Sequence, residues 1–90
     1  MGIGGKSVLP EMWDMVRPLI QGSIVCTLKE IASAIRLLVE RNRIVAEGGG
    51  AASVAAALTG KAGKGKIVCV VSGGNIDTAK LETILSGKVP

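Results

Sequence analysis

The chain contains no histidine, and it has only two cysteines among its 90 residues. Cys26 and Cys69 stand far apart in apolar stretches and form no Cys-x-x-Cys pair. Zinc sites and Cys/His catalysis need histidine or clustered cysteine, so the sequence excludes both kinds of site. We expect the two cysteines to be buried, reduced, small apolar side chains of a cytoplasmic protein.

Long apolar runs are also lacking. No stretch reaches the roughly 18 apolar residues that a membrane span requires, and we expect no membrane partner. The N-terminus shows no basic region followed by an apolar run, so no signal peptide is visible.

Clustered positive charge is confined to one short stretch. The formal net charge is +4, and Lys61, Lys64 and Lys66 form its single concentration. No aromatic residue stands among these lysines, which makes the stretch a poor nucleic-acid surface and predicts a solvated loop. A P-loop is also excluded here, because Ile67 occupies the place of the required Ser or Thr.

What the chain does contain is small and aliphatic. Hydrophobic residues make up 48% of the sequence, aromatics 1%, and there are 13 glycines. Stand-alone small domains usually rely on aromatic side chains to bury area, and the core available to 90 residues is thin. This composition is typical of the interior of a larger α/β protein.

Helical patterns occupy much of the sequence. The clearest covers residues 28–41, where Thr27 and Glu30 form a capping box and apolar residues recur at helical spacing. Arg41 and Arg43 complement the helix dipole at its end. Three further helices are expected: from Pro10 to a kink or end at Arg17, over residues 51–58, and from an Asp77 N-cap to about Leu85.

Two segments have the composition of strands. Residues 67–71 are continuously apolar and mostly β-branched, as in a strand buried on both faces of a parallel sheet. Residues 23–26 could form a short second strand. The sequence therefore predicts an α/β fold over a single unit, residues 1–90, with three to four helices, one buried strand and one short strand.

Two glycine-rich loops are the candidate sites. Ser72-Gly73-Gly74-Asn75 follows the predicted buried strand, at the edge where open α/β sheets bind ligands. Glu47 precedes Gly48, Gly49 and Gly50 in a similar way. Taken alone, each loop somewhat favours a structural interpretation: a tight turn that needs glycine in the first case, and a helix start with a dipole-favoured carboxylate in the second.

These motifs resemble the end of the catalytic domain in one enzyme family. Glu47-Gly48-Gly49-Gly50-Ala51 is similar to the Glu-Gly-x-Gly-Ala motif of the threonine/serine dehydratases, with Gly49 in place of the more usual alanine. Ser72-Gly73-Gly74-Asn75-Ile76-Asp77 is similar to their Ser-Gly-Gly-Asn-(Ile/Val)-Asp motif. These are pyridoxal-phosphate (PLP) enzymes of fold-type II, and Gly2-Ile3 and the apolar stretch before Thr27 also match them.

The resemblance implies a role for each motif residue. Ser72 would hydrogen-bond the pyridine nitrogen of PLP, and Gly73 and Gly74 would let the loop lie against the ring. Glu47 and Gly48 on one side, and Asn75 on the other, would border the cofactor. A neutral hydroxyl makes the ring a weaker electron sink than a carboxylate would, which suits β-elimination of a hydroxy amino acid.

The departures from the family imply that this chain is inactive alone. The Schiff-base lysine, the substrate-carboxylate loop and the phosphate loop have no counterpart in the sequence. We therefore expect weak or absent PLP binding, and a C-terminal fragment that needs a complementing N-terminal half or self-association. Two alternatives stay open: an oligomeric structural or binding module without catalysis, and a small basic protein that binds nucleic acid through its lysine loop.

Overall fold

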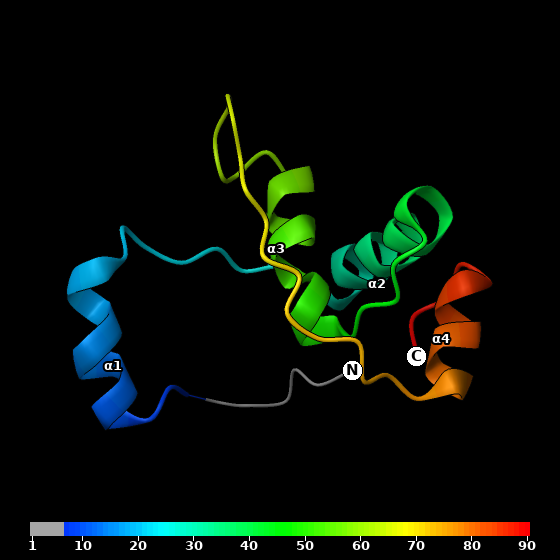
Figure 1. Cartoon of the computed structure of the whole chain (residues 1–90), viewed down its shortest axis with the longest axis horizontal. Helices are drawn as coiled ribbons and strands as arrows, with labels where there is room; N and C mark the ends of the chain where they lie inside the picture. Colours follow the sequence, from blue (N-terminus) through cyan, green and yellow to red (C-terminus); the bar gives the residue numbers. More distant parts are fainter. Residues whose placement is uncertain (1–6) are drawn as a thin grey trace.

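The computed structural model describes residues 7–90, and the Gly2-Ile3 part of the resemblance lies outside them. In chain order the elements are α1 (Pro10–Val16), the 3-10 helix η1 (Arg17–Leu19), α2 (Leu28–Leu37), the π-helix η2 (Leu38–Asn42), α3 (Gly48–Leu58) and α4 (Thr78–Leu85). Helices α2, α3 and α4 gather into one body, and α1 stands apart from it (Figure 1).

The predicted capping box is confirmed at the start of α2. The Thr27 hydroxyl accepts a hydrogen bond from the Glu30 amide at 3.1 Å, and the Glu30 carboxylate accepts one from the Thr27 amide at 2.8 Å. The helix continues as η2 to Asn42, close to the predicted end. Arg43 then adopts a left-handed conformation (φ 57°), and its guanidinium donates to the carbonyls of Val39 and Glu40.

The other helix predictions are also confirmed, with one shifted boundary. Helix α1 ends at Val16, and the 3-10 turn that follows contains Pro18. Helix α3 begins at Gly48, three positions before the predicted start at Ala51. The Asp77 carboxylate accepts a hydrogen bond from the Ala79 amide at 3.1 Å and so caps α4, which ends at Leu85 as expected.

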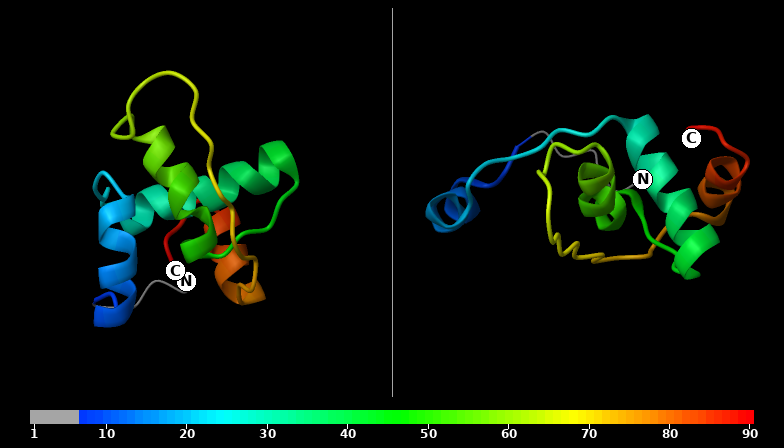
Figure 2. Two further views of the ribbon diagram at one scale, coloured as in Figure 1. Left: turned by 60° about the vertical axis from the view of Figure 1, so that its left-hand side comes forward. Right: turned by 90° about the horizontal axis from the view of Figure 1, so that it is seen from above.

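The core is small and consists mainly of alanine and isoleucine. It lies where α2 packs against α3 on one side and α4 on the other (Figure 2). Among residues 7–90, Ile35 and Ile84 are the large side chains that are completely enclosed. The buried apolar residues are Ile31, Ala32, Ala34, Ile35, Leu38, Ala46, Ala51, Ala55 and Ile84.

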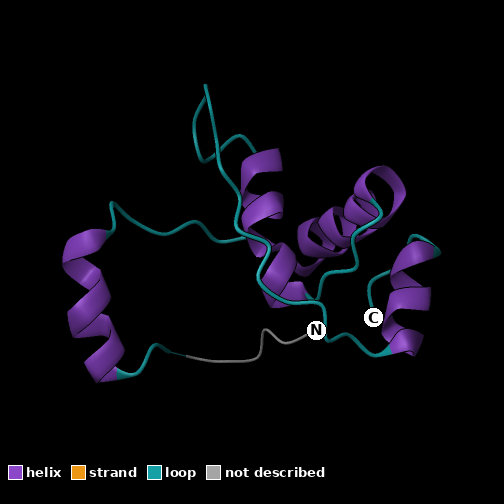
Figure 3. Ribbon diagram, viewed as in Figure 1, coloured by secondary structure: helices purple, strands orange, loops and turns teal. Residues whose placement is uncertain are grey.

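The predicted α/β fold is wrong for this chain. Residues 7–90 are helical or irregular and contain no strand (Figure 3). A strand requires backbone hydrogen bonds to a neighbouring strand, and residues 67–71 make none to any described segment. The expected burial is also missing, since Val68 is 93% exposed and Val70 is 73% exposed.

The cysteine prediction was partly wrong. Cys26 and Cys69 are both free, as expected, but each is half-buried where full burial was predicted. None of the helices in residues 7–90 combines the length and apolar character needed to cross a bilayer.

The capping box makes the stability of the chain depend on pH. A hydrogen bond from the Thr27 amide, and a second contribution from its side chain, hold the pKa of Glu30 below its ordinary value. This stabilisation is present above the unfolded-state pKa and is lost as the pH falls through the lower, folded-state pKa. We therefore expect Glu30→Gln to reduce the fall in the free energy of unfolding between neutral and acidic pH. Urea unfolding at a series of pH values measures this slope. The variant Glu82→Gln, on α4, is the matched control and should keep the native slope.

Candidate functional site

The two predicted site loops lie side by side in the structure. The amide of Glu47 donates a hydrogen bond to the carbonyl of Gly73 at 2.9 Å. This bond joins the segment just before α3 to the loop of residues 72–75. The structure thus brings together two motifs that the sequence places far apart.

Helix α3 also contacts the segment that leads to the loop of residues 72–75. The Ser53 hydroxyl donates to the carbonyl of Val70 at 2.8 Å, and the Cys69 thiol lies 3.5 Å from the carbonyl of Ser53. Residues 67–71 therefore run along α3 (Figure 2), and the loop that follows reaches the N-terminal end of that helix, where Gly73 contacts Glu47 and Gly50. Sequence reasoning missed Ser53 as a support, because nothing in its local pattern separates it from an ordinary polar position in a helix.

The glycines of both loops allow the backbones to approach closely. A Cβ at Gly50 would lie 2.8 Å from the amide nitrogen of Gly73 and closer still to its carbonyl oxygen. A Cβ at Gly74 would lie 2.5 Å from the carbonyl oxygen of Val45. The sequence left two interpretations open, a close-lying ligand and a structural need for glycine, and the structure shows that Gly50 and Gly74 are required for contact between the two segments.

The polar groups at this junction face outward. Ser72 and Asn75 are exposed, and their side chains have no hydrogen-bond partner within residues 7–90. Glu47 is half-buried, and its Oε1 lies 2.7 Å from the position that a Cβ on Gly73 would occupy. Gly48 is buried as the first residue of α3. The junction therefore presents a free hydroxyl, a free amide and a carboxylate beside bare backbone.

This arrangement fits one end of a flat heteroaromatic ligand. A hydroxyl can donate to or accept from a ring nitrogen, and glycine backbone lets a ring lie close. Neither loop carries a lysine or an arginine, so the junction offers no cationic side chain to a ligand. No cluster of His, Cys, Asp or Glu within the described part of the chain could hold a metal ion.

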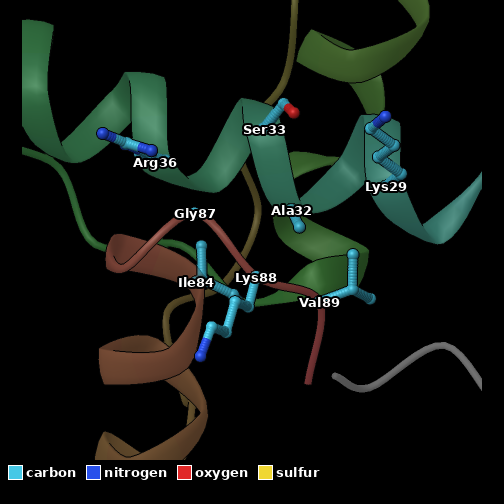
Figure 4. Close-up of a pocket in the computed structure, with 8 residues that line it drawn as sticks. All are labelled: Lys29, Ala32, Ser33, Arg36, Ile84, Gly87, Lys88 and Val89. Carbon is cyan, nitrogen blue, oxygen red and sulfur yellow. The ribbon is translucent and has the colours of Figure 1, made fainter.

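A separate small cavity lies between α2 and the C-terminal end of α4, and it does not form a site. Its volume is about 90 Å³, and Figure 4 shows its lining residues. Lys29 and Lys88 point away from each other, and Arg36 is paired with Glu40 at 2.5 Å. The cations therefore do not converge on a common ligand.

Residues 1–73 match the family described as "Pyridoxal-phosphate dependent enzyme". The chain is 37% identical over 86 residues to an L-threonine ammonia-lyase of Thermotoga maritima, an alignment that covers 94% of this chain and 21% of that protein. It is 36% identical over 86 residues to an L-threonine ammonia-lyase of Geobacter sulfurreducens, covering 93% and 21%. A catabolic L-threonine dehydratase of Escherichia coli K12 is 36% identical over 76 residues, covering 80% and 23%.

The chain spans about a fifth of the length of these curated relatives. No solved structure matches it.

Proposed function

We propose that this chain, which belongs to the pyridoxal-phosphate dependent enzyme family, supplies the wall that contacts the pyridine ring of PLP in a threonine- or serine-dehydrating enzyme. The observation that carries the proposal is the hydrogen bond between Glu47 and Gly73, which joins the two motif loops. The names of the relatives support threonine as a substrate of the complete enzyme.

Ser72 is the residue to which we assign the ring nitrogen. Its hydroxyl is exposed and has no partner within residues 7–90, so it is free to bind a ligand. Gly73 and Gly74 leave the backbone uncovered beside it, and Asn75 and the Glu47–Gly48 segment border the same junction. When bound, PLP supplies the electron sink for loss of the proton and the hydroxyl group from the amino acid.

The residues present account for only one end of the cofactor. In the family, PLP is also held by a phosphate loop and by a covalently linked lysine, and neither motif occurs in this sequence. The wall proposed here orients the ring and leaves its nitrogen unprotonated. Anchoring and proton transfer belong to a complementing part of the enzyme, which we propose as the partner of this chain.

A chimera tests the role of Ser72. In this chimera, the segment of the Thermotoga maritima ammonia-lyase that aligns with this chain is replaced by the chain. The Ser72→Ala variant of the chimera is then compared with the unchanged chimera. Loss of one neutral hydrogen bond, about 0.5–1.5 kcal/mol, should weaken PLP binding by about 2- to 13-fold and alter the absorbance of the bound cofactor. Ser33→Ala is the control, because Ser33 is an exposed residue of α2 whose side chain forms no hydrogen bond within residues 7–90. Equal PLP affinity, spectrum and turnover in all three proteins would make Ser72 a turn residue only.

The isolated chain is expected to have no threonine or serine dehydratase activity. The physical reason is the missing lysine link and phosphate anchor, without which the ring is not held against the substrate. The measurement is 2-oxobutanoate and ammonia formation from threonine and added PLP, with Ser72→Ala as the background control. Turnover above that background would contradict the proposed dependence on a complementing partner.

A further inference from the structure

Ser53 is the one polar side chain of α3, and its hydroxyl is bonded to the segment that leads to Ser72. The other residues of Gly48–Leu58 are glycine, alanine, valine and leucine. Serine has a lower intrinsic helix propensity than alanine, so the hydroxyl gives the helix itself no advantage at this position. It donates a hydrogen bond at 2.8 Å to the carbonyl of Val70, which lies 17 positions along the chain. The hydroxyl therefore stabilises the loop and not its own helix.

The segment of residues 69–72 depends on such side-chain contacts for its position. Within residues 7–90, no residue of this segment takes part in a hydrogen bond between backbone groups. The Cys69 thiol adds one weak contact, at 3.5 Å from the carbonyl of Ser53. Ser53 thus holds two consecutive residues of the segment, Val70 with its side chain and Cys69 with its own backbone.

The contacts with α3 fix the chain on both sides of Ser72. Gly50 and Ser53 are three positions apart in α3, so they lie on the same face of the helix. Gly50 lies against the backbone of Gly73, and the Ser53 hydroxyl binds the carbonyl three positions earlier. Ser72 stands between the two fixed residues, one position before Gly73 and two after Val70. Loss of the Ser53 hydrogen bond would leave the loop fixed on its Gly73 side alone.

We propose that Ser53 is a positioning residue for the contact between Ser72 and the cofactor. This role rests on the proposed function, in which the Ser72 hydroxyl binds the pyridine nitrogen of PLP. A hydrogen bond weakens steeply when its donor and acceptor are misaligned, so the exposed Ser72 hydroxyl needs a fixed backbone to keep its direction. By holding Val70, Ser53 supplies that backbone, and it acts through the loop and not by contact with the ring.

The first test measures the loop in the chain without PLP. We expect Ser53→Ala to lower the backbone order parameters of Val71 and Ser72, measured by NMR relaxation, from a rigid value of about 0.85 towards about 0.6. Helix α3 should be retained, because alanine is the better helix former. Ser53→Thr keeps a hydroxyl and should keep the native order parameters, and Ser33→Ala is the control. Unchanged order parameters in Ser53→Ala overturn the proposal, whatever the result with PLP.

The second test measures PLP binding in the chimera with the Thermotoga maritima ammonia-lyase. Ser53→Ala should weaken PLP binding by about 2- to 5-fold and shift the absorbance of the bound cofactor, because the ring contact is misaligned and not removed. Ser53→Thr should restore both the affinity and the absorbance. In a Ser72→Ala background, Ser53→Ala should change neither of them, because Ser53 acts through Ser72.

The outcomes separate the role of Ser53 from that of Ser72. An effect of Ser72→Ala without any effect of Ser53→Ala overturns the positioning role and leaves the assignment of Ser72 intact. An effect of Ser53→Ala that persists in the Ser72→Ala background also overturns the positioning role. If neither variant changes the affinity or the absorbance of PLP, the assignment of Ser72 fails and the positioning role fails with it, even where the loop loses order in the first test.

Discussion

Replacement of Gly50 by alanine is expected to lower the free energy of unfolding by about 2–3 kcal/mol and to separate the two motif loops. The added Cβ would lie 2.8 Å from the amide nitrogen of Gly73, and no side-chain rotation can relieve a clash with backbone. Alanine also favours the helix by about 0.5–1 kcal/mol, but this gain is smaller than the cost of the clash. The hydrogen bond from Glu47 to Gly73 should be lost with the contact.

Gly49→Ala is the matched control for this prediction. Gly49 lies in the same first turn of α3 and is exposed, so Gly49→Ala should receive the helix-favouring gain. Urea unfolding measures both variants, and hydrogen exchange at the Glu47 amide reports on the loop contact directly. A Gly50→Ala chain as stable as Gly49→Ala, with an unchanged Glu47 amide, would contradict the close approach described here.

Local signals explain why the helices could be predicted. The capping box uses Thr27 and Glu30, which are three residues apart, and Asp77 caps α4 through the amide of Ala79. These contacts depend only on neighbouring residues, so their pattern is readable in the sequence. The predicted helix range began at Ala51 because three consecutive glycines, from Gly48 to Gly50, have low helix propensity, whereas the alternative interpretation of Glu47 as a helix start is confirmed by its N-cap position. Here the close contact with residue 73 outweighs that intrinsic preference.

The strand prediction failed because a strand is not a local structure. Residues 67–71 have the composition of a buried strand, but composition does not supply a neighbour with which to form hydrogen bonds. In this chain the segment lies along α3 through the Ser53–Val70 hydrogen bond, with Val68 turned to solvent. The site was predictable in part for the same reason. Its residues could be named from motifs, whereas the Glu47–Gly73 contact depends on tertiary packing.

Ile35→Ala is expected to remove much of the stability of the chain. Ile35 is fully enclosed between α2 and its neighbours, and Ile84 is the single other large side chain within residues 7–90 with such complete burial. Truncation of a buried isoleucine to alanine costs about 2–5 kcal/mol, depending on how far the surroundings collapse. Much of the surrounding core is alanine, including Ala34, Ala51 and Ala55, and alanine has no side-chain torsion with which to fill a cavity. The cost should therefore lie in the upper part of that range.

The effect of Ile35→Ala on the folded population depends on the total free energy of unfolding of the chain. A domain of this size is stable by about 5–13 kcal/mol at typical values per residue, so Ile35→Ala should shift the chain markedly toward the unfolded state. Thermal and urea unfolding followed by circular dichroism measure the change. Leu28→Ala is the control, since Leu28 lies on the same helix but is 51% exposed, and it should cost less than about 1 kcal/mol. If the two variants unfold alike, the α2–α3–α4 core does not hold the chain together, and the junction of Glu47 and Gly73 would need support from a partner.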